Sequence, residues 1–337
     1  MRSGFVTAGT WCLDRNISID FWPREDMVAT TRGIELAGGG SACNFAVDLR
    51  RLDPMIPVAT QGLIGNDAAG DFLVGVAQEY GIDHSRLLRS DTAPSQTTDA
   101  YASLENGRRT HIVFNGAGDI LSPDHFDFSG STARVMHLGL PGIHRVMDAP
   151  WHDDANGWVT VLRKSRAAGL LNDLEFVSGP ASQIRALGLP CLPLLDSLVV
   201  NDHEIGALAD LPTVVEGETD LAQVKLAVDR ALERGSMQVV AVHFTMGAYL
   251  KARDGTGIFQ PSVLVPDAER KGANGAGDAF SAGFHYGLHQ GWSGQDSLKL
   301  GHAAAASCLR SAGTYTSVGT VRDCLALAQS WGWRSGD

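Results

Sequence analysis

The sequence predicts a doubly wound α/β fold, in which a mainly parallel β-sheet carries helices on both faces. From about residue 134 onward, apolar runs typical of buried strands alternate with helical patterns. Of the 337 residues, 44% are hydrophobic, which allows a sizeable core. Segments at about 15–37 and 95–115 instead alternate polar and apolar residues, as two-sided strands do. We expect a single domain over 1–337, with these two segments forming a small β-sheet lid.

The N-terminal half begins with an apolar run at 4–13, which predicts a buried first strand ending at Asp14. Asp14 would then lie at the carboxyl edge of the sheet, where such folds place ligand groups, or it would simply start a turn. The second lid segment contains Glu105-Asn106-Gly107, a strong hairpin signal. The other elements expected here are a helix at 45–52, a strand at 58–65 and a helix from about 66 to 80.

The C-terminal half repeats a strand–helix alternation. The expected strands lie at 134–140, 169–177, 194–200, 238–244 and 248–252. The expected helices lie at 156–167, 181–187, 203–208, 219–234 and 296–311. A further helix follows Asp278, because Phe280, Phe284 and Leu288 form one apolar stripe.

Composition argues against several classes of function. The chain has 27 basic and 38 acidic residues, a net charge of −11, and no cluster of Lys or Arg. Nucleic acid and anionic membrane surfaces are therefore not expected partners. The five cysteines are scattered without CxxC spacing, which indicates reduced core thiols. No segment has the pattern of a signal peptide or a membrane span, so we expect a cytoplasmic protein.

The strongest chemical signal lies at 271–284. Glycine-rich residues 272–277 lead into the predicted helix, with Asp278 at its start. Such a turn presents free N–H groups and the positive end of the helix dipole, which favours an anion such as phosphate. A carboxylate is a poor phosphate ligand but a useful base beside one. The alternative is an ordinary N-capping Asp after a flexible loop, which an isolated motif of this kind fits about equally well.

Two other places could contact a ligand. Gly38-Gly39-Gly40 precedes Asn44 at another predicted helix start, where the backbone is accessible and the Asn44 amide can donate and accept hydrogen bonds. Asn201 and Glu204 follow an apolar strand and stand one helical turn apart, so they can face one ligand. Asn201 could equally be a helix cap with Glu204 as its partner.

In their order and spacing these motifs resemble the ribokinase-like (PfkB) family of carbohydrate and nucleoside kinases, over nearly the whole chain. The matching motifs are Gly9-x-x-x-x-Asp14, Gly39-Gly40-x-x-x-Asn44, Gly62-x-x-Gly65-x-Asp67-x-x-Gly70, Asn201-x-x-Glu204 and Gly275-Ala276-Gly277-Asp278. The resemblance implies a ribokinase-like α/β fold with a β-sheet lid. It also implies an enzyme that moves the γ-phosphate of ATP to a hydroxyl of a sugar or sugar-like substrate.

The resemblance further implies roles for individual residues. Asp278 would take the proton of the substrate hydroxyl, beside an anion hole formed by the backbone of Gly275, Ala276 and Gly277. The substrate would contact Asp14, Gly39, Gly40 and Asn44. The nucleotide would contact Asn201, Glu204, Thr245, Gly247, Asn274 and Gly277. Glu204 would hold Mg²⁺ through water, and the lid would close over the sugar.

The sequence departs from the family's pattern at four places. Gly272 stands where relatives have an Asp that helps hold a monovalent cation, so potassium activation is doubtful. Leu250 replaces the second glycine of the nucleotide segment that begins at Thr245. Gly139 stands where ribokinases have a sugar-contacting Glu, and Asp173-Leu-Glu175 replaces the usual Asp-x-Asn. Ribose is therefore not the favoured substrate.

Three alternatives to a sugar kinase follow from the same residues. A nucleoside (adenosine-like) kinase belongs to the same class of enzyme. A non-catalytic sugar-binding sensor of the same fold is suggested by the altered nucleotide segment. A dinucleotide-dependent oxidoreductase is disfavoured, because no G-x-G-x-x-G follows the first strand. For any of them we expect a homodimer formed through the lid, because the alternation at 15–37 and 95–115 leaves one apolar sheet face to cover.

Overall fold

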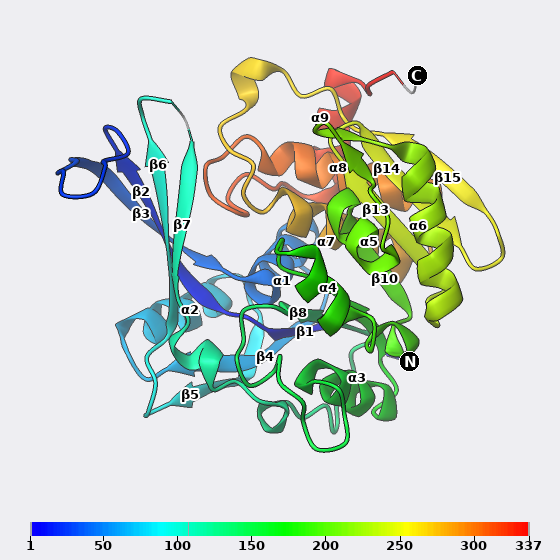
Figure 1. The fold of residues 1–337 in the computed structure, drawn as a ribbon, viewed down its shortest axis with the longest axis horizontal. Coiled ribbons are helices and arrows are strands. Elements are labelled where there is room, and N and C mark those ends of the chain that lie inside the picture. The colour runs from blue at the N-terminus through cyan, green and yellow to red at the C-terminus, as the bar shows by residue number, and fades with distance from the viewer. Residues whose placement is uncertain (1, 107, 336–337) are drawn as a thin grey trace.

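The computed structural model describes residues 2–106 and 108–335, and it has the predicted doubly wound α/β architecture (Figure 1). A central layer of strands lies between two layers of helices, and four further strands extend away from this body as a lid. Gly107, from the predicted hairpin turn, lies outside the described residues. Its neighbour Asn106 accepts a hydrogen bond from Arg108 N through its side-chain oxygen (2.9 Å).

Two sheets form the central layer. The first is parallel throughout, in the order β5 (Asp83–Ser90), β4 (Val58–Gly65), β1 (Phe5–Gly9), β8 (Val135–Gly139) and β9 (Leu171–Leu174). The second has the order β10 (Ser197–Asn201), β13 (Val239–Phe244), β14 (Gly247–Ala252) and β15 (Gly257–Pro261). In the second sheet only β10 and β13 are parallel. The sheets meet between β9 and β10, where Asp196 N donates to Asn172 O (2.9 Å) and Asn172 N to Asp196 Oδ2 (2.8 Å).

Helices cover both faces of the central layer. One face carries α1 (Ser41–Leu52), α2 (Ala68–Glu79), α7 (Ala276–His289), α8 (Gly294–Cys308) and α9 (Val321–Trp331). The other carries α3 (Gly157–Ala167), α4 (Ala181–Gly188), α5 (Asp202–Ala209) and α6 (Leu221–Arg234). Two-residue strands β11 (Val214–Val215) and β12 (Glu218–Thr219) form a small separate hairpin.

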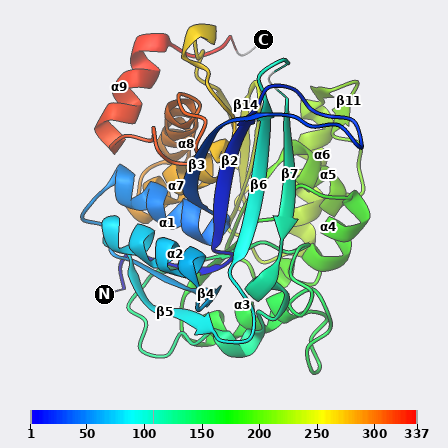
Figure 2. The same ribbon diagram turned by 90° about the vertical axis from the view of Figure 1, so that its left-hand side faces the viewer.

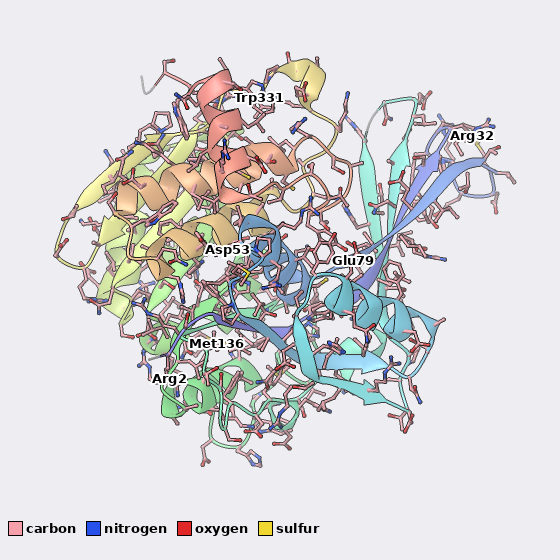
Figure 3. The ribbon with its side chains drawn as sticks, turned by 180° about the vertical axis from the view of Figure 1, so that it is seen from behind. Arg2, Arg32, Asp53, Glu79, Met136 and Trp331 are labelled. Atoms are coloured by element: carbon pink, nitrogen blue, oxygen red, sulfur yellow. The ribbon has the colours of Figure 1, made fainter. Side chains whose placement is uncertain are left out.

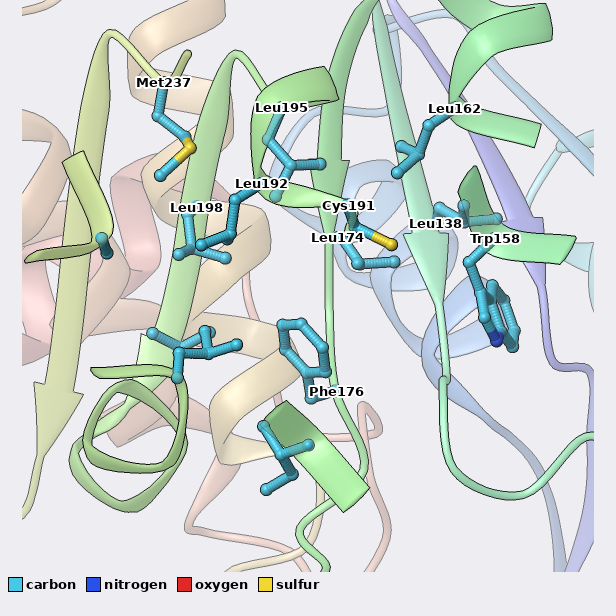
Figure 4. Packing of buried hydrophobic residues seen from close by; sticks show 14 of the residues in the cluster. Leu138, Trp158, Leu162, Leu174, Phe176, Cys191, Leu192, Leu195, Leu198 and Met237 are labelled. Atoms are coloured by element: carbon cyan, nitrogen blue, oxygen red, sulfur yellow. The ribbon is translucent and has the colours of Figure 1, made fainter. Parts of the chain in front are cut away.

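Successive residues of the central strands pack alternately into the two hydrophobic cores, because side chains of a strand point to opposite faces in turn. Phe5 of β1 packs with the α1 layer, whereas its neighbour Val6 packs with the α3 layer. Figure 4 shows part of the second core, where Trp158 of α3 and Leu174 of β9 lie in a continuous apolar cluster with Leu198 of β10. These two cores hold the strand ends that bear the functional groups.

The lid is a four-stranded sheet, seen face-on in Figure 2. Its order is β3 (Thr31–Gly39), β2 (Cys12–Ile19), β6 (Gln96–Ser103) and β7 (Arg109–Phe114). Strands β2 and β6 are parallel, and the outer pairs are antiparallel. The register places Asp14 beside Thr98 on one face of the lid. Arg15 and Asp99 pair on the opposite face, with nitrogen–oxygen distances of 2.5 and 2.6 Å.

The predicted single strand at 4–13 is wrong, because the chain leaves the central sheet after Gly9 and enters the lid at Cys12. Gly9 has a φ of 120° and its Cα lies against the Gly139 carbonyl, so the backbone can turn there only without a side chain. Asp14 therefore lies in the lid strand β2 and not at the edge of the central sheet. The apolar run from Phe5 to Leu13 hides this break.

Other boundaries also differ from the predictions. Helix α1 begins at Ser41, ahead of the predicted start at Phe45, because Gly40 is its N-cap. Strands β5 and β15 and helix α9 were not predicted. Both strands are at sheet edges, and β5 is mostly exposed, so it lacks the apolar run that marks a central strand.

None of the described helices combines the length and apolar character needed to cross a bilayer. All five cysteines are buried and free.

The lid has one apolar face that is largely uncovered. Ile34 and Leu36 of β3 are 59% and 50% exposed, and Ile112 and Phe114 of β7 are each 55% exposed. The register puts all four on the face that also bears Ile17 of β2. Figure 3 shows how far this sheet reaches from the body, with Arg32 near its tip.

We propose that two copies of the chain pair through this apolar face. Light scattering should then give twice the 35.8 kDa of one chain at micromolar concentration. Ile34→Glu should shift the mass to that of a monomer, because it buries a charge in the shared face. Leu226→Glu on α6 is the control, since its exposure of 52% is similar and it lies outside the lid. A wild-type protein that stays monomeric across this range would contradict the proposal.

Candidate active site

Helix α7 begins at the glycine-rich loop and creates an anion-accepting end. Gly275, its N-cap, has a φ of 74°, a left-handed conformation that glycine adopts freely. The first amides of a helix lack partners inside it, so the N–H groups of Gly277 and Asp278 can face a ligand. The N–H of Ala276 makes a long bond to the Ala273 carbonyl (3.4 Å), which a ligand would have to replace. Gly277 lines two neighbouring cavities, a small pocket of about 120 Å³ and a larger cleft of about 1000 Å³. The glycine-rich loop and the start of α7 thus lie together as expected, and an anion hole there remains a prediction.

Asp278 lies in the first turn of α7 and touches the second glycine-rich loop. The side-chain nitrogen of Asn44 donates a hydrogen bond to Asp278 Oδ2 (3.2 Å), across 234 residues of sequence. Asn44 belongs to the first turn of α1, which begins after Gly40. Two predicted groups, one from each loop, are therefore brought into direct contact. The pKa of Asp278 is raised well above its usual value by burial and by the neighbouring Glu175 carboxyl, against the opposing effects of Asn44 and His137.

Asp14 lies at the base of the lid, beside the second glycine-rich loop. Its carboxylate lies against Gly39, where any Cβ would overlap it, so the glycine makes room for the acid. Cys12 Sγ donates to Asp14 Oδ1 (3.3 Å). Burial raises the pKa of Asp14 to about 6, although hydrogen bonds from Cys12 and Thr98 oppose the shift. A ligand hydroxyl that donates a hydrogen bond to the Asp14 carboxylate would favour its ionised form.

Asn201 and Glu204 form a capping box at the start of α5, which is the alternative that the sequence left open. Asn201 Oδ1 accepts from Glu204 N (2.8 Å), and Glu204 Oε2 accepts from Asn201 N (3.0 Å). Both residues also line a pocket of about 120 Å³ together with Gly277 and Asp278. Burial raises the pKa of Glu204 to about 7. The capping role thus places an oxygen-rich pair beside the anion hole.

A larger cleft of about 1000 Å³ opens next to this pocket. Thr245, predicted to contact a nucleotide, is among its lining residues. Its walls also include Ala102, Ser103 and Leu104 of the lid, the histidines His203, His243 and His302, and the cations Arg270, Lys271 and Arg334. None of these three cations was predicted as a site residue. Arg270 and Lys271 could have been noticed in the sequence, because they directly precede the glycine-rich loop. They supply local positive charge in a chain of net charge −11.

Two residues predicted to contact the nucleotide lie apart from the cavity walls. Gly247 is buried in β14, where a Cβ would run into the Gln260 carbonyl of the next strand, so it serves strand pairing. Asn274 offers its carbonyl to the Cys308 thiol (3.3 Å). Leu250, which stands in place of a family glycine, is 2% exposed in a core with Phe280.

A buried ionic cluster behind Asp278 was not predicted. His137 of β8 bonds Asp173 Oδ2 through Nδ1 (2.8 Å) and Glu175 Oε2 through Nε2 (2.9 Å). Burial opposes the charged form of His137, but the two carboxylates outweigh it and raise the pKa of His137 to about 9. Phe45 stacks on the imidazole with ring centroids 3.9 Å apart. The unusual His137 and Glu175 were visible in the sequence, but their contact was not.

Residues 11–320 match the family model described as pfkB family carbohydrate kinase. Among curated proteins, the chain is 24% identical to a ribokinase of Arabidopsis thaliana, over 96% of this chain and 80% of that protein. It is 24% identical to an adenosine kinase of Schizosaccharomyces pombe, over 83% of this chain and 82% of that protein. It is 25% identical to a 5-dehydro-2-deoxygluconokinase of Photobacterium profundum, over 86% of this chain and 85% of that protein.

The fold is also found among solved structures. The structure of Arabidopsis thaliana ribokinase complexed with ribose and ATP superposes with a TM-score of 0.77. It is 22% identical in sequence and covers 98% of this chain and 99% of its own. At this identity the likeness establishes the ribokinase-like α/β fold, as the sequence motifs predicted.

The start of α7 yields a stability prediction. Gly275→Ala should lower the free energy of unfolding by about 1–2 kcal/mol or more, because left-handed backbone disfavours a Cβ and the new methyl would overlap the Thr314 carbonyl. Gly277→Ala is the matched control, since its Cβ would meet nothing closer than His243 Cε1 at 3.5 Å. Chemical denaturation of both variants measures the difference. Equal stability would show that the loop does not need this conformation.

Proposed function

The chain belongs to the pfkB family of carbohydrate kinases, and on this premise we propose that it transfers the γ-phosphoryl group of ATP to a hydroxyl of a sugar or sugar-like substrate. The hydrogen bond from Asn44 to Asp278 carries the proposal. It joins the starts of α1 and α7, and Asp278 lines the small pocket, which shares Gly277 with the large cleft. An acceptor held by one loop and a phosphate held by the other would meet at Asp278.

The acceptor side suits a molecule with several hydroxyls. Asn44 Oδ1 is buried, with no hydrogen-bond partner in the described part of the chain, so it is free to accept from a hydroxyl. The Asp14 carboxylate is a second acceptor. Asn16 and Thr98 lie on the same face of the lid as Asp14 and add polar groups. Closure of this face over the substrate would exclude water and limit hydrolysis of ATP.

The donor side suits a nucleotide triphosphate. The amides of residues 276–278 would stabilise charge on the transferring phosphoryl group, and Arg270 and Lys271 lie in the wall of the cleft that leads there. Asp278 would accept the hydroxyl proton while the substrate oxygen bonds to the γ-phosphorus and the bond to the β-phosphate oxygen breaks. The cleft would hold the nucleoside between Thr245, Phe244 and the small residues of α8.

The small pocket fits Mg²⁺, which prefers oxygen ligands and keeps several waters. Glu204 and Asn201 supply the oxygens there, and Ser178 also lines the pocket. Both Glu204 oxygens already accept hydrogen bonds, so we expect a water between Glu204 and the ion. Bound Mg²⁺ would neutralise phosphate charge.

We expect the chain to accept only part of the range of substrates that the family phosphorylates. We propose that ribose is disfavoured, because Gly139 has no carboxylate and its Cα lies against the Ser41 hydroxyl, leaving no room for a longer side chain. A nucleoside kinase is the second candidate, and the adenosine kinase relative supports it. A sensor without turnover is less favoured, since Leu250 packs in the core and leaves Asp278 and the anion hole intact. The free, buried cysteines favour the cytoplasm as its location.

The test is a ligand panel followed by a turnover assay. Melting temperatures would be measured with ATP, ADP and NAD, and with sugars, sugar acids and nucleosides. A ligand at about 100 times its Kd should stabilise the fold by about 2.7 kcal/mol. Phosphorylation of a sugar that stabilises the fold would support the proposal. Phosphorylation of a nucleoside would support the second candidate. Binding without turnover of any ligand would leave only a sensor.

Asp278→Asn should abolish phosphoryl transfer and leave the fold intact. Loss of a general base typically costs about 10²–10⁴ in rate. Gly275, and not Asp278, is the N-cap of α7, and Asn keeps the size of the side chain, so the melting temperature should not fall much below wild type. Asp296→Asn, in the first turn of α8, is the control that should keep full activity. A variant at position 278 that keeps more than about a tenth of wild-type kcat would overturn the assignment.

Potassium should have little effect on the rate. Gly272 supplies no carboxylate, and the neighbouring carbonyls of Asn274 and Thr314 already accept the Cys308 thiol (3.3 and 3.0 Å). Rates would be compared in sodium, Tris and potassium buffers of equal ionic strength. A large rise in potassium alone would mean that backbone carbonyls suffice to hold the ion.

A further inference from the structure

A row of neighbouring acids and histidines runs from the candidate base into the protein interior. The carboxyls of Asp278 and Glu175 line the same small pocket and are close enough to share a hydrogen bond. Glu175 is bonded to His137 (2.9 Å), and His137 is bonded to Asp173 (2.8 Å). Asp173 Oδ1 lies 3.3 Å from His285 Nε2, which is 3.1 Å from the Ser197 hydroxyl.

The environment of this carboxyl pair is strongly acidic. The titratable groups facing it are Asp48 of α1, His137 of β8, Asp173 of β9, Glu204 of α5 and Asp202 and His243 beside them. Both oxygens of Asp48 are buried, and neither has a hydrogen-bond partner among the residues that the structure describes. His137 is the cation that contacts Glu175 directly. Two adjacent carboxyls in such surroundings favour holding one proton between them.

We propose that Glu175, fixed by His137, is a positioning residue that shares a proton with Asp278 and leads the substrate proton away from it. The inference rests on the proposed kinase function. Before transfer, the shared proton resides on a Glu175 oxygen and Asp278 is the carboxylate. When Asp278 takes the proton of the substrate hydroxyl, Glu175 releases its own proton to water, and the proton on Asp278 moves into the hydrogen bond that joins the pair. The pair again holds one proton, so no other reactant is required.

The position of Glu175 suits this role. Its side chain is 19% exposed, whereas those of His137 and Asp173 are 0% and 1% exposed. Glu175 is thus the member of the row behind Asp278 that opens toward solvent through the small pocket. His137 is locked on both ring nitrogens and stacked on Phe45, so it holds the Glu175 carboxyl in place. The usual Asn of the family could not carry a proton at this position.

The test is the pH dependence of kcat/KM in two variants that remove opposite charges. A general base works only when ionised, so activity falls as the pH drops through the pKa of Asp278. Glu175→Gln removes a neighbouring negative charge and should move the acid limb to lower pH by roughly one unit or more. His137→Asn removes the positive charge and should move the limb to higher pH. Ser197→Ala, at the far end of the row, should leave the limb unchanged.

Two opposite shifts are not expected of a merely structural role, which would lower activity at every pH. Glu175→Gln keeps the size of the side chain and can still accept from His137, so it should fold even if His137→Asn does not. An unchanged acid limb in Glu175→Gln would overturn the inference and leave the kinase function standing. A raised Mg²⁺ requirement with no shift would instead assign Glu175 to the metal, and would equally overturn it.

A second measurement is independent of turnover. An acid whose folded pKa is raised loses stability as the pH rises from its unfolded toward its folded pKa. Glu175→Gln removes a carboxyl that raises the pKa of Asp278, so its melting temperature relative to wild type should become less unfavourable as the pH rises above the ordinary pKa of a carboxyl. A constant difference as the pH rises would show that the carboxyls do not share a proton. This result separates a failure of the inference from a failure of the proposed function.

Discussion

The hydrogen bond between Asn44 and Asp278 is the contact on which the site depends. It links the first turns of α1 and α7, which pack side by side on one face of the central sheet. Each helix starts at a glycine-rich loop, so fixing one helix against the other also fixes the distance between the two loops. The central strands and both cores serve to keep these two helix ends in register.

Charge balance is the second constraint at this point. Asp278, Glu175 and Asp48 lie close together in a chain that is already acidic overall. His137 offsets the group from inside. His285 and His137 together hold the pKa of Asp173 well below its usual range, against the effect of burial. On the side of the cleft, the positive end of α7 and the Arg270-Lys271 pair offset this negative charge. Anionic phosphate can therefore approach a site whose side chains are mostly acidic.

Much of this arrangement could be predicted from the sequence, because it depends on local patterns. The glycine-rich start of α7, Asn44 and the capping pair Asn201 and Glu204 lie in short motifs whose geometry follows from a few residues. The break after Gly9 could not be predicted, since apolar residues continue across it. The contact between His137 and Glu175 could not be either, because it depends on β8 and β9 being neighbours in the sheet. At Gly247 a motif position also has a structural role, because strand pairing leaves no room for a side chain there.

Strand β2 has a double use that restricts how its sequence can change. Asp14 and Asn16 lie on the face proposed to meet the substrate, whereas Arg15 and Ile17 lie on the opposite face, which bears the exposed apolar residues. Inserting or deleting one residue would exchange the two sides at once, so the acid would face outward and an isoleucine would enter the site. Length changes in this strand are therefore tolerable only in pairs of residues. Among relatives, variation should gather in the 20–30 connection to β3 rather than in β2 itself.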